Sequence, residues 1–143
     1  MTVKAILRNK GYAVHTIEPG ATLAEAARLL DTKGIGALVV SDAQRRVIGI
    51  LSERDIVRKL AEQGARALDI SVEGAMTRRV ATCQETDSVG DLMEQMTNGK
   101  FRHVPVVEEG RLIGIISIGD VVKYRLGEME AESIAMREYI QTA

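Results

Sequence analysis

The spacing of hydrophobic and polar positions predicts short helices alternating with short strands. Four apolar residues in the first third of the chain are spaced i, i+3, i+4, i+7, which makes one apolar face of a helix: Leu23, Ala26, Ala27 and Leu30. A short strand near Val14–Ile17 precedes this helix. Two β-rich runs follow it, Ala37–Val40 and Arg46–Leu51, joined by a hairpin loop. A second helix, Glu53–Gln63, completes a β-α-β-β-α order.

The same pattern occurs a second time. Val47–Val57 matches Leu112–Val122 at an offset of 65, with six of eleven positions identical. Upstream the offset is 66, which one residue lost from the second hairpin loop explains. The second helical quartet is Val89, Leu92, Met93 and Met96. The second copy therefore predicts a strand near Val80–Cys83, strands His103–Val107 and Leu112–Ile116, and a helix Ile118–Arg125.

Local signals support both copies. Thr22-x-x-Glu25 and Ser88-x-x-Asp91 resemble capping boxes at the starts of the first helices.

A half of ~60 residues buries only about 60% of its unfolded surface and is marginal alone. We therefore expect the two copies to pack sheet to sheet about a pseudo-twofold axis.

The predicted fold class is α/β (α+β) with a C-terminal helix. We divide the chain into a first repeat with the N-terminal segment (1–65), a second repeat (66–126) and a terminal helix (127–143). Ala65–Met76 connects the repeats. The terminal helix is interpreted as packing on a partner or acting as a lid.

Composition excludes several classes of function. The net charge of −1 and 3% aromatic residues argue against nucleic-acid binding. Cys83 is the only cysteine, so an intrachain disulfide and a cysteine zinc cluster are excluded. We find no apolar run of the ~20 residues needed to span a bilayer and no signal peptide, so we expect a cytoplasmic protein without membrane partners.

The duplicated motif, Gly-Ile-(Ile/Leu)-Ser-x-x-Asp followed by a helix, resembles the CBS domain, and the pair resembles a Bateman module. The resemblance covers residues 10–126 and includes Met76-Thr77 and Arg102–Val107. The chain is similar to small stand-alone bacterial CBS-pair proteins. The resemblance implies a non-enzymatic regulatory module with no required cofactor, which binds AMP, ADP, ATP, NAD(H) or S-adenosylmethionine. It also implies a homodimer and an effector protein as partner.

The second copy places suitable chemistry at a helix start. Ser117 lies at a helix N-terminus, where free N–H groups and the macrodipole attract a phosphate. Asp120, one turn on, has the two acceptor oxygens that a ribose diol needs. Gly119 leaves room for a close ligand. Ser-x-x-Asp is also an ordinary helix cap, but its recurrence as Ser52 and Asp55 favours a shared ligand design.

Other residues divide between binding and structure. Arg102 is a candidate bidentate phosphate ligand and His103 a candidate donor, with a solvated Arg and a structural His as the alternative. The first copy has Gly36 and Ala37 there, although Arg54 is a candidate substitute, so we expect the better site in the second copy. The resemblance places the base against the first strand of each copy, at Val14 and Val80, which are also plausible core residues.

Three other functions stay open from the sequence alone. A ligand-independent dimeric interaction module would act through a partner protein. A nucleotide-processing enzyme would need a nucleophile or base that no motif provides. Nucleic-acid binding would need a steep salt dependence.

Overall fold

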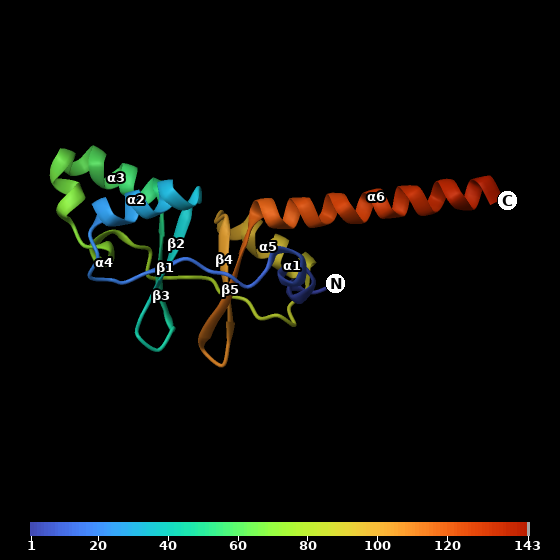
Figure 1. Cartoon of the computed structure of the whole chain (residues 1–143), viewed down its shortest axis with the longest axis horizontal. Helices are drawn as coiled ribbons and strands as arrows, with labels where there is room; N and C mark the ends of the chain where they lie inside the picture. Colours follow the sequence, from blue (N-terminus) through green and yellow to red (C-terminus); the bar gives the residue numbers. More distant parts are fainter. Residues whose placement is uncertain (143) are drawn as a thin grey trace.

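The computed structural model describes residues 1–142 and divides them into two halves, each built on a small sheet (Figure 1). In the first half, α2 (Leu23–Lys33) and α3 (Glu53–Gln63) pack on a sheet of order β1-β2-β3. Strand β1 (Thr16–Ile17) is parallel to β2 (Ala37–Ser41), and β2 is antiparallel to β3 (Val47–Ser52). The predicted β-α-β-β-α order is confirmed here, although the first strand has only two residues.

The second half repeats this plan with one element missing. It contains α5 (Val89–Gly99), β4 (His103–Glu108), β5 (Arg111–Ser117) and the start of α6 (Ile118–Thr142). Strands β4 and β5 form an antiparallel two-stranded sheet. The repeated motif therefore gives the same hairpin and the same strand-to-helix junction in both halves.

The predicted strand near Val80–Cys83 is wrong. Only Cys83 pairs with the second sheet, through a single parallel bridge to Val106. The reason lies upstream, where Thr77 exchanges two backbone hydrogen bonds with Ile50 of the first sheet. The chain must cross from one half to the other between these two contacts, so it reaches the second sheet too late to form a ladder.

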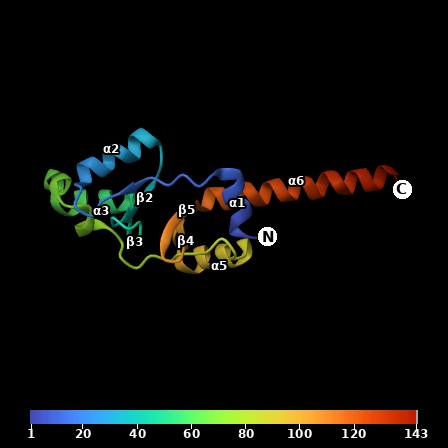
Figure 2. The same cartoon turned by 60° about the horizontal axis from the view of Figure 1, so that its bottom comes forward.

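The two halves exchange helices at their ends. Helix α1 (Val3–Lys10) precedes the first half in sequence, but its buried face lies in the same apolar core as α5, β4 and β5. After the 3-10 helix η1 (Gly64–Asp69), α4 (Val72–Ala75) contributes to the core of the first half. The segments that follow α1 and α4 cross between the halves in both ribbon views (Figures 1 and 2). The sequence boundaries 1–65 and 66–126 stay a prediction.

The sheets also meet at their hairpins. The N–H of Leu112 donates to the carbonyl of Arg45 at 2.9 Å, and the backbones of Arg46 and Arg111 form an antiparallel β-bridge. The two halves therefore face one another through sheet edges and connecting segments, with helices outside.

The helix cap predicted at Thr22 is confirmed, because both hydrogen bonds of the capping box with Glu25 are formed.

Met93 departs from the predicted core face. It is 40% exposed, whereas Met96 is buried. In the first copy the equivalent position holds Ala27, which is partly buried against its core. A methionine at this edge of the helix extends past the core, so the prediction that it packs inside is wrong.

The C-terminal helix is present, but it is not a separate element. α6 runs unbroken over 25 residues, so the expected division into Ile118–Arg125 and a tail from Gly127 is wrong. A single exposed glycine costs a helix about 1 kcal/mol relative to alanine, too little to end it. Residue 143 lies outside the described residues. Beyond the body α6 extends away from both halves (Figures 1 and 2). Within residues 1–142, no helix combines the length and apolarity required to cross a bilayer.

Candidate functional site

The candidate site is built where a strand ends and a helix begins. Ser52 ends β3 before α3, and Ser117 ends β5 before α6. In the first copy, the first N–H of the helix donates to the carbonyl of Gly36 at 3.0 Å. In the second copy, the same N–H donates to the carbonyl of Arg102 at 2.8 Å. The sequence repeat thus gives two equivalent backbone frames.

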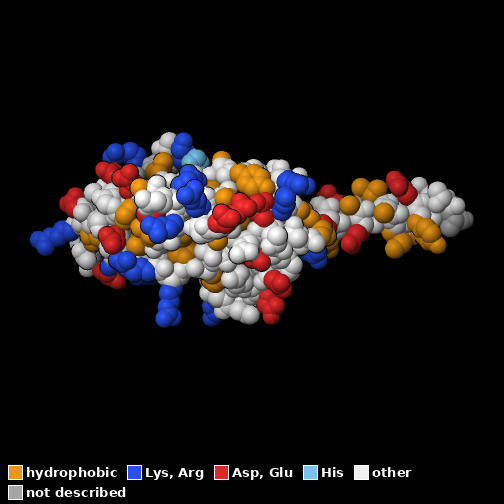
Figure 3. Space-filling model, turned by 90° about the horizontal axis from the view of Figure 1, so that it is seen from below, with side chains coloured by type: hydrophobic (Ala, Val, Ile, Leu, Met, Phe, Trp, Pro, Cys, Tyr) orange, Lys and Arg blue, Asp and Glu red, His pale blue; other side chains and the backbone are white. Residues whose placement is uncertain are grey.

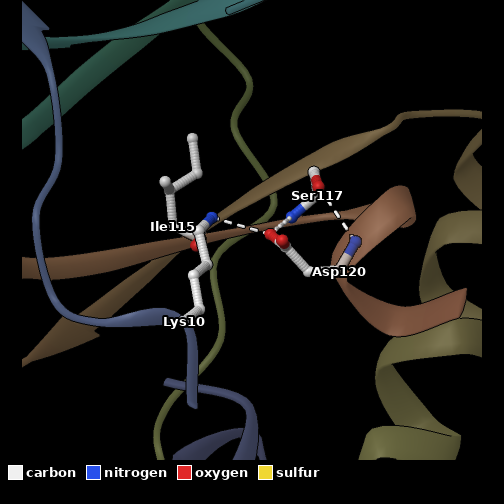
Figure 4. A network of polar contacts seen from close by, with 4 residues as sticks. All are labelled: Lys10, Ile115, Ser117 and Asp120. Carbon is white, nitrogen blue, oxygen red and sulfur yellow. Dashed lines mark hydrogen bonds and ion pairs between the residues drawn. The ribbon is translucent and has the colours of Figure 1, made fainter. Parts of the chain in front are cut away.

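In the second copy, serine and aspartate cap each other. The N–H of Ser117 donates to Asp120 Oδ2 at 2.8 Å, and the N–H of Asp120 donates to Ser117 Oγ at 3.1 Å (Figure 4). The interpretation of this motif as a helix cap is therefore confirmed. A cap does not use every oxygen of the two side chains, so it does not exclude a ligand at the same place.

Lys10, at the end of α1, joins this pair from 110 residues away. Its Nζ donates to Asp120 Oδ2 at 2.7 Å and to the carbonyl of Ile115 at 2.7 Å (Figure 4). The side chains of Lys10 and Asp120 are 29% and 23% exposed. The pair is therefore partly shielded from water while remaining open on one side.

The electrostatics of Asp120 follow from these contacts. Partial burial acts to raise the pKa of Asp120, but hydrogen bonds from Lys10 and from the Ser117 backbone outweigh it, so the pKa lies below its usual value. The carboxylate is therefore charged at neutral pH, which makes it a stronger acceptor for hydroxyl groups than a neutral oxygen.

The first copy uses its aspartate differently. Asp55 is 6% exposed and is the only buried charged residue among residues 1–142. Its Oδ2 accepts from both the N–H and the hydroxyl of Ser52, at 2.9 and 3.1 Å. Its Oδ1 lies 3.5 Å from Arg58 Nη1. Both carboxylate oxygens are engaged within the chain.

This contrast distinguishes the copies. Within residues 1–142, Asp120 Oδ1 has no hydrogen-bond partner, because Ser117 and Lys10 both contact Oδ2. The Ser117 hydroxyl accepts from the Asp120 N–H at 3.1 Å, and its interaction with the carboxylate also contributes to the lowered pKa of Asp120. A ligand can therefore find a charged acceptor and a hydroxyl donor at the second helix start.

Arg102 and His103 flank this helix start. Arg102 is exposed, and no ion pair to its guanidinium is formed within the described residues. His103 is half-buried at the beginning of β4, where its backbone pairs with Ser117. The sequence therefore places an exposed arginine and a half-buried histidine on the segment that pairs with the second helix start.

His103 also links the two halves. A Cβ built on Gly36 would lie 2.9 Å from Glu53 Oε1 and 3.9 Å from His103 Cε1, so the first copy's helix start approaches the second copy's strand. Burial lowers the pKa of His103, with Lys10 and Arg102 acting in the same direction and Asp120 and Glu53 against it. The imidazole is therefore neutral at pH 7 and offers one donor and one acceptor.

The remaining predicted residues lie partly at these two helix starts and partly in the segments that connect the halves. Arg54 is exposed on the first turn of α3. Gly119 is exposed, and an added Cβ would meet only Ser117 Oγ at 3.6 Å, so the fold itself does not require glycine there. Val14 and Val80 are half-buried in the two connecting segments, outside any strand.

Two hollows lie on the helical surfaces. One of about 460 Å³ lies between α2 and α3, and its lining includes Gly36 and Glu53, which adjoin His103. The other, about 560 Å³, follows α6 from Ile118 to Glu130. The first reaches the junction between the halves, and the second follows an exposed helix face.

Metal and thiol chemistry find no support in the described residues. Residues 1–142 contain no group of three or more His, Cys, Asp or Glu able to hold a metal ion. Cys83 is buried, and burial raises the pKa of its thiol to about 12. It is a packing residue of the second core.

Sequence reasoning missed Lys10 and Glu53. The signal for Lys10 was present, because Val3, Ile6 and Leu7 follow helical spacing and predict an amphipathic helix that ends at this lysine. That the helix crosses to the second copy is a tertiary fact that local pattern does not contain. Glu53 is found only once the two halves are packed together.

Comparisons with known proteins agree with this geometry. Residues 3–62 and 69–127 each match the family model of the CBS domain. The CBS-domain containing protein ATU1752 from Agrobacterium tumefaciens is 53% identical, with a TM-score of 0.83 over 87% of this chain and 92% of that one. The CBS domain pair of protein MJ0100, solved with 5′-methylthioadenosine and S-adenosyl-L-methionine, is 28% identical, with a TM-score of 0.80 over 90% and 98%.

Two curated relatives extend the similarity. An uncharacterized 17.7 kDa protein from Acidianus ambivalens is 40% identical over 77% of this chain and 66% of its own length. The mitochondrial CBS domain-containing protein CBSX3 of Arabidopsis thaliana is 34% identical over 84% of this chain and 60% of its own length. The chain thus spans about two thirds or less of these relatives. With both repeats matched by the family model, the chain belongs to the CBS-domain proteins and contains a pair of CBS domains.

Proposed function

We propose that this protein is a non-enzymatic sensor that binds AMP or another adenosine-containing ligand, ADP, ATP or NAD(H) among them, at the junction of its CBS domains. The stronger site is the second helix start, where Asp120 Oδ1 accepts the ribose diol and the Ser117 hydroxyl donates to a phosphate. The observation that carries the proposal is the partner-free Oδ1 of a charged, partly shielded carboxylate.

The surrounding charges support a phosphate-bearing ligand. Lys10 lies against Asp120, Arg102 is exposed without an ion pair in the described part of the chain, and His103 is neutral and half-buried. Lys10 offsets the charge of Asp120, and the exposed Arg102 is a candidate ligand for an anionic group. The solved pair of protein MJ0100 with two adenosine compounds supports the adenosine class.

The first repeat has a weaker role in this proposal. Asp55 is held by Ser52 and Arg58, so a ligand there must displace an internal contact before it can bind. Arg54 and Glu53 stay available at that helix start. We therefore expect one ligand per chain at moderate concentration, with the base against Val80 or Val14.

In this proposal the protein transmits the binding of its ligand to an effector protein. The chain forms a homodimer in the cytoplasm, and ligand binding favours one arrangement of the repeats, which an effector protein recognises. CBS domains are generally regulatory modules without catalytic activity, which supports this division of labour.

A second candidate is a ligand-independent interaction module. The observation in its favour is the set of exposed apolar side chains on the helices, Val57 and Met93 among them. In this case the dimer and the effector contact form without any nucleotide.

Thermal unfolding of the full chain distinguishes the two. We expect 1 mM AMP, ATP, NADH or S-adenosylmethionine to stabilise the fold, and a ligand with a Kd of about 10 μM would add about 2.7 kcal/mol. GMP at the same concentration, which differs from AMP only in its base, is the matched control for base recognition. If no adenosine compound raises the unfolding temperature, the sensor proposal is wrong and the ligand-independent module takes its place.

A further inference from the structure

The outer part of α6 has no support from the rest of the molecule. Every residue from Met129 to Thr142 is exposed. Figure 3 shows hydrophobic side chains along this protruding helix, with charged groups beside them. An isolated helix of this length is marginal in water. Its exposed apolar surface therefore points to a partner.

Five of the eight exposed large hydrophobic residues of α6 lie along one seam, which Ser133 interrupts. Six positions alternate in steps of four and three along the helix, which is the a/d pattern of a coiled coil: Val122, Leu126, Met129, Ser133, Met136 and Ile140. The five hydrophobic members are between 50% and 66% exposed. Val121, one position away, is buried in the second core, so the seam lies on a face turned away from it.

A hollow lies along the beginning of this seam. It has a volume of about 560 Å³ and is lined by residues of α6 alone, Val122 and Leu126 included. Gly127 leaves the helix backbone open there. Such an open surface accepts the side chain of a closely packed second helix.

Charges beside the seam select the partner and its direction. In a parallel pair, each g residue faces the e residue five positions later on the other helix. Here these pairs are Arg125 with Glu130 and Glu132 with Arg137, each of opposite sign. Arg125 also reaches Glu128 of its own helix at 3.1 Å. The pattern is self-complementary, so the fitting occupant is a second copy of this chain.

We propose that two chains pair through α6 in parallel and in register, which places like halves side by side. Other exposed apolar residues of the helices, Val57, Leu60 and Met93, provide further contact surface for such a dimer. The inference rests on the proposed homodimer and adds its direction and register.

Single cysteines test the direction. In the full chain, Leu126→Cys and Ile140→Cys lie fourteen residues apart, about 21 Å along the helix. In a parallel, in-register pair, the introduced cysteine of one chain lies opposite the same cysteine of the second chain. Both variants therefore cross-link on mild oxidation. An antiparallel pair can superpose only one of the two positions on itself. Ile134→Cys, which is 55% exposed but off the seam, is the matched control that stays uncross-linked.

Sedimentation velocity of each variant completes the experiment, and the buried Cys83 of the unaltered chain gives the background. If both variants, Leu126→Cys and Ile140→Cys, are dimers that cross-link, the proposal is supported. If the variants are dimers but only one or neither of them cross-links, or if Ile134→Cys cross-links equally, the parallel register is wrong and the homodimer stands. If the variants are monomers that do not cross-link, both the register and the homodimer are wrong. A charge reversal, Glu132→Arg, should weaken the dimer roughly fivefold, with Arg137→Glu restoring it.

Discussion

Replacing Lys10 by methionine separates its charge from its packing. The wild-type ammonium donates to Asp120 Oδ2 and to the Ile115 carbonyl, both at 2.7 Å. Methionine keeps an apolar stem of similar length but removes both hydrogen bonds. Because the ion pair is partly shielded, we expect a loss of about 1–2 kcal/mol in the free energy of unfolding at pH 7.

The loss should depend on pH with a definite sign. The pKa of Asp120 is lower in the folded chain than in the unfolded chain, so its contribution to stability is present above about pH 4 and is lost as pH falls through the folded pKa. The difference between wild type and Lys10→Met should therefore shrink in acid to what the hydrogen bond to the Ile115 carbonyl contributes. Urea unfolding between pH 7 and pH 3 measures this difference, with the exposed Lys4→Met as control.

The same variant tests the ligand's charge. For a phosphate about 8 Å from the lost ammonium, Coulomb's law at a dielectric constant between about 20 and 80 gives about 0.5–2 kcal/mol, or roughly 2- to 30-fold in affinity for each charge. AMP should lose more affinity than adenosine in titration calorimetry. A stability loss that does not change with pH, or an equal effect on both ligands, would refute the electrostatic role of Lys10.

Two further substitutions probe the site from its edges. Gly119→Ala should leave the fold unchanged or slightly more stable, because its Cβ meets only Ser117 Oγ at 3.6 Å, yet it should weaken AMP binding; Gly90→Ala, the equivalent position of α5, is the calorimetric control. Unchanged AMP affinity in Gly119→Ala would place the ligand elsewhere. His103 has a lowered pKa, so it destabilises the fold when protonated, and stability should fall as pH drops below about 6.5 toward its folded pKa. The free energy of unfolding, measured with denaturant, should fall less steeply with decreasing pH in this range for His103→Gln than for the wild type. The exposed His15→Gln should show the same pH dependence as the wild type. An equal pH dependence in His103→Gln and the wild type would contradict the assignment.

Local patterns predicted most of the elements because each depends on neighbouring residues. The helix at Leu23–Lys33 follows from apolar spacing and a capping pair, and the hairpins follow from β-rich runs around turns. The repeat also predicted two equivalent helix starts, which the structure contains. These features require no knowledge of how the halves pack.

Features that depend on packing between distant segments were beyond this reasoning. The strand near Val80–Cys83 fails because Thr77 is held by the first sheet, and α6 continues past Gly127 because one glycine is a weak stop signal. The two aspartates looked alike in sequence, yet Lys10 reaches one and Arg58 the other. The difference between the candidate sites is therefore a property of the tertiary structure.

The most direct measurement is the affinity of Asp120→Asn for the adenosine ligand that stabilises the wild type most. Asparagine keeps the shape and can still accept from the Ser117 N–H, but it removes the charged oxygen that we assign to the ribose. Hydrogen bonds to a charged group contribute about 1.5–3 kcal/mol, so calorimetry should show a loss of roughly 10- to 100-fold. Asp91→Asn, at the same position of α5, should bind like the wild type. Wild-type affinity in Asp120→Asn, or an equal loss in Asp91→Asn, would contradict the assignment.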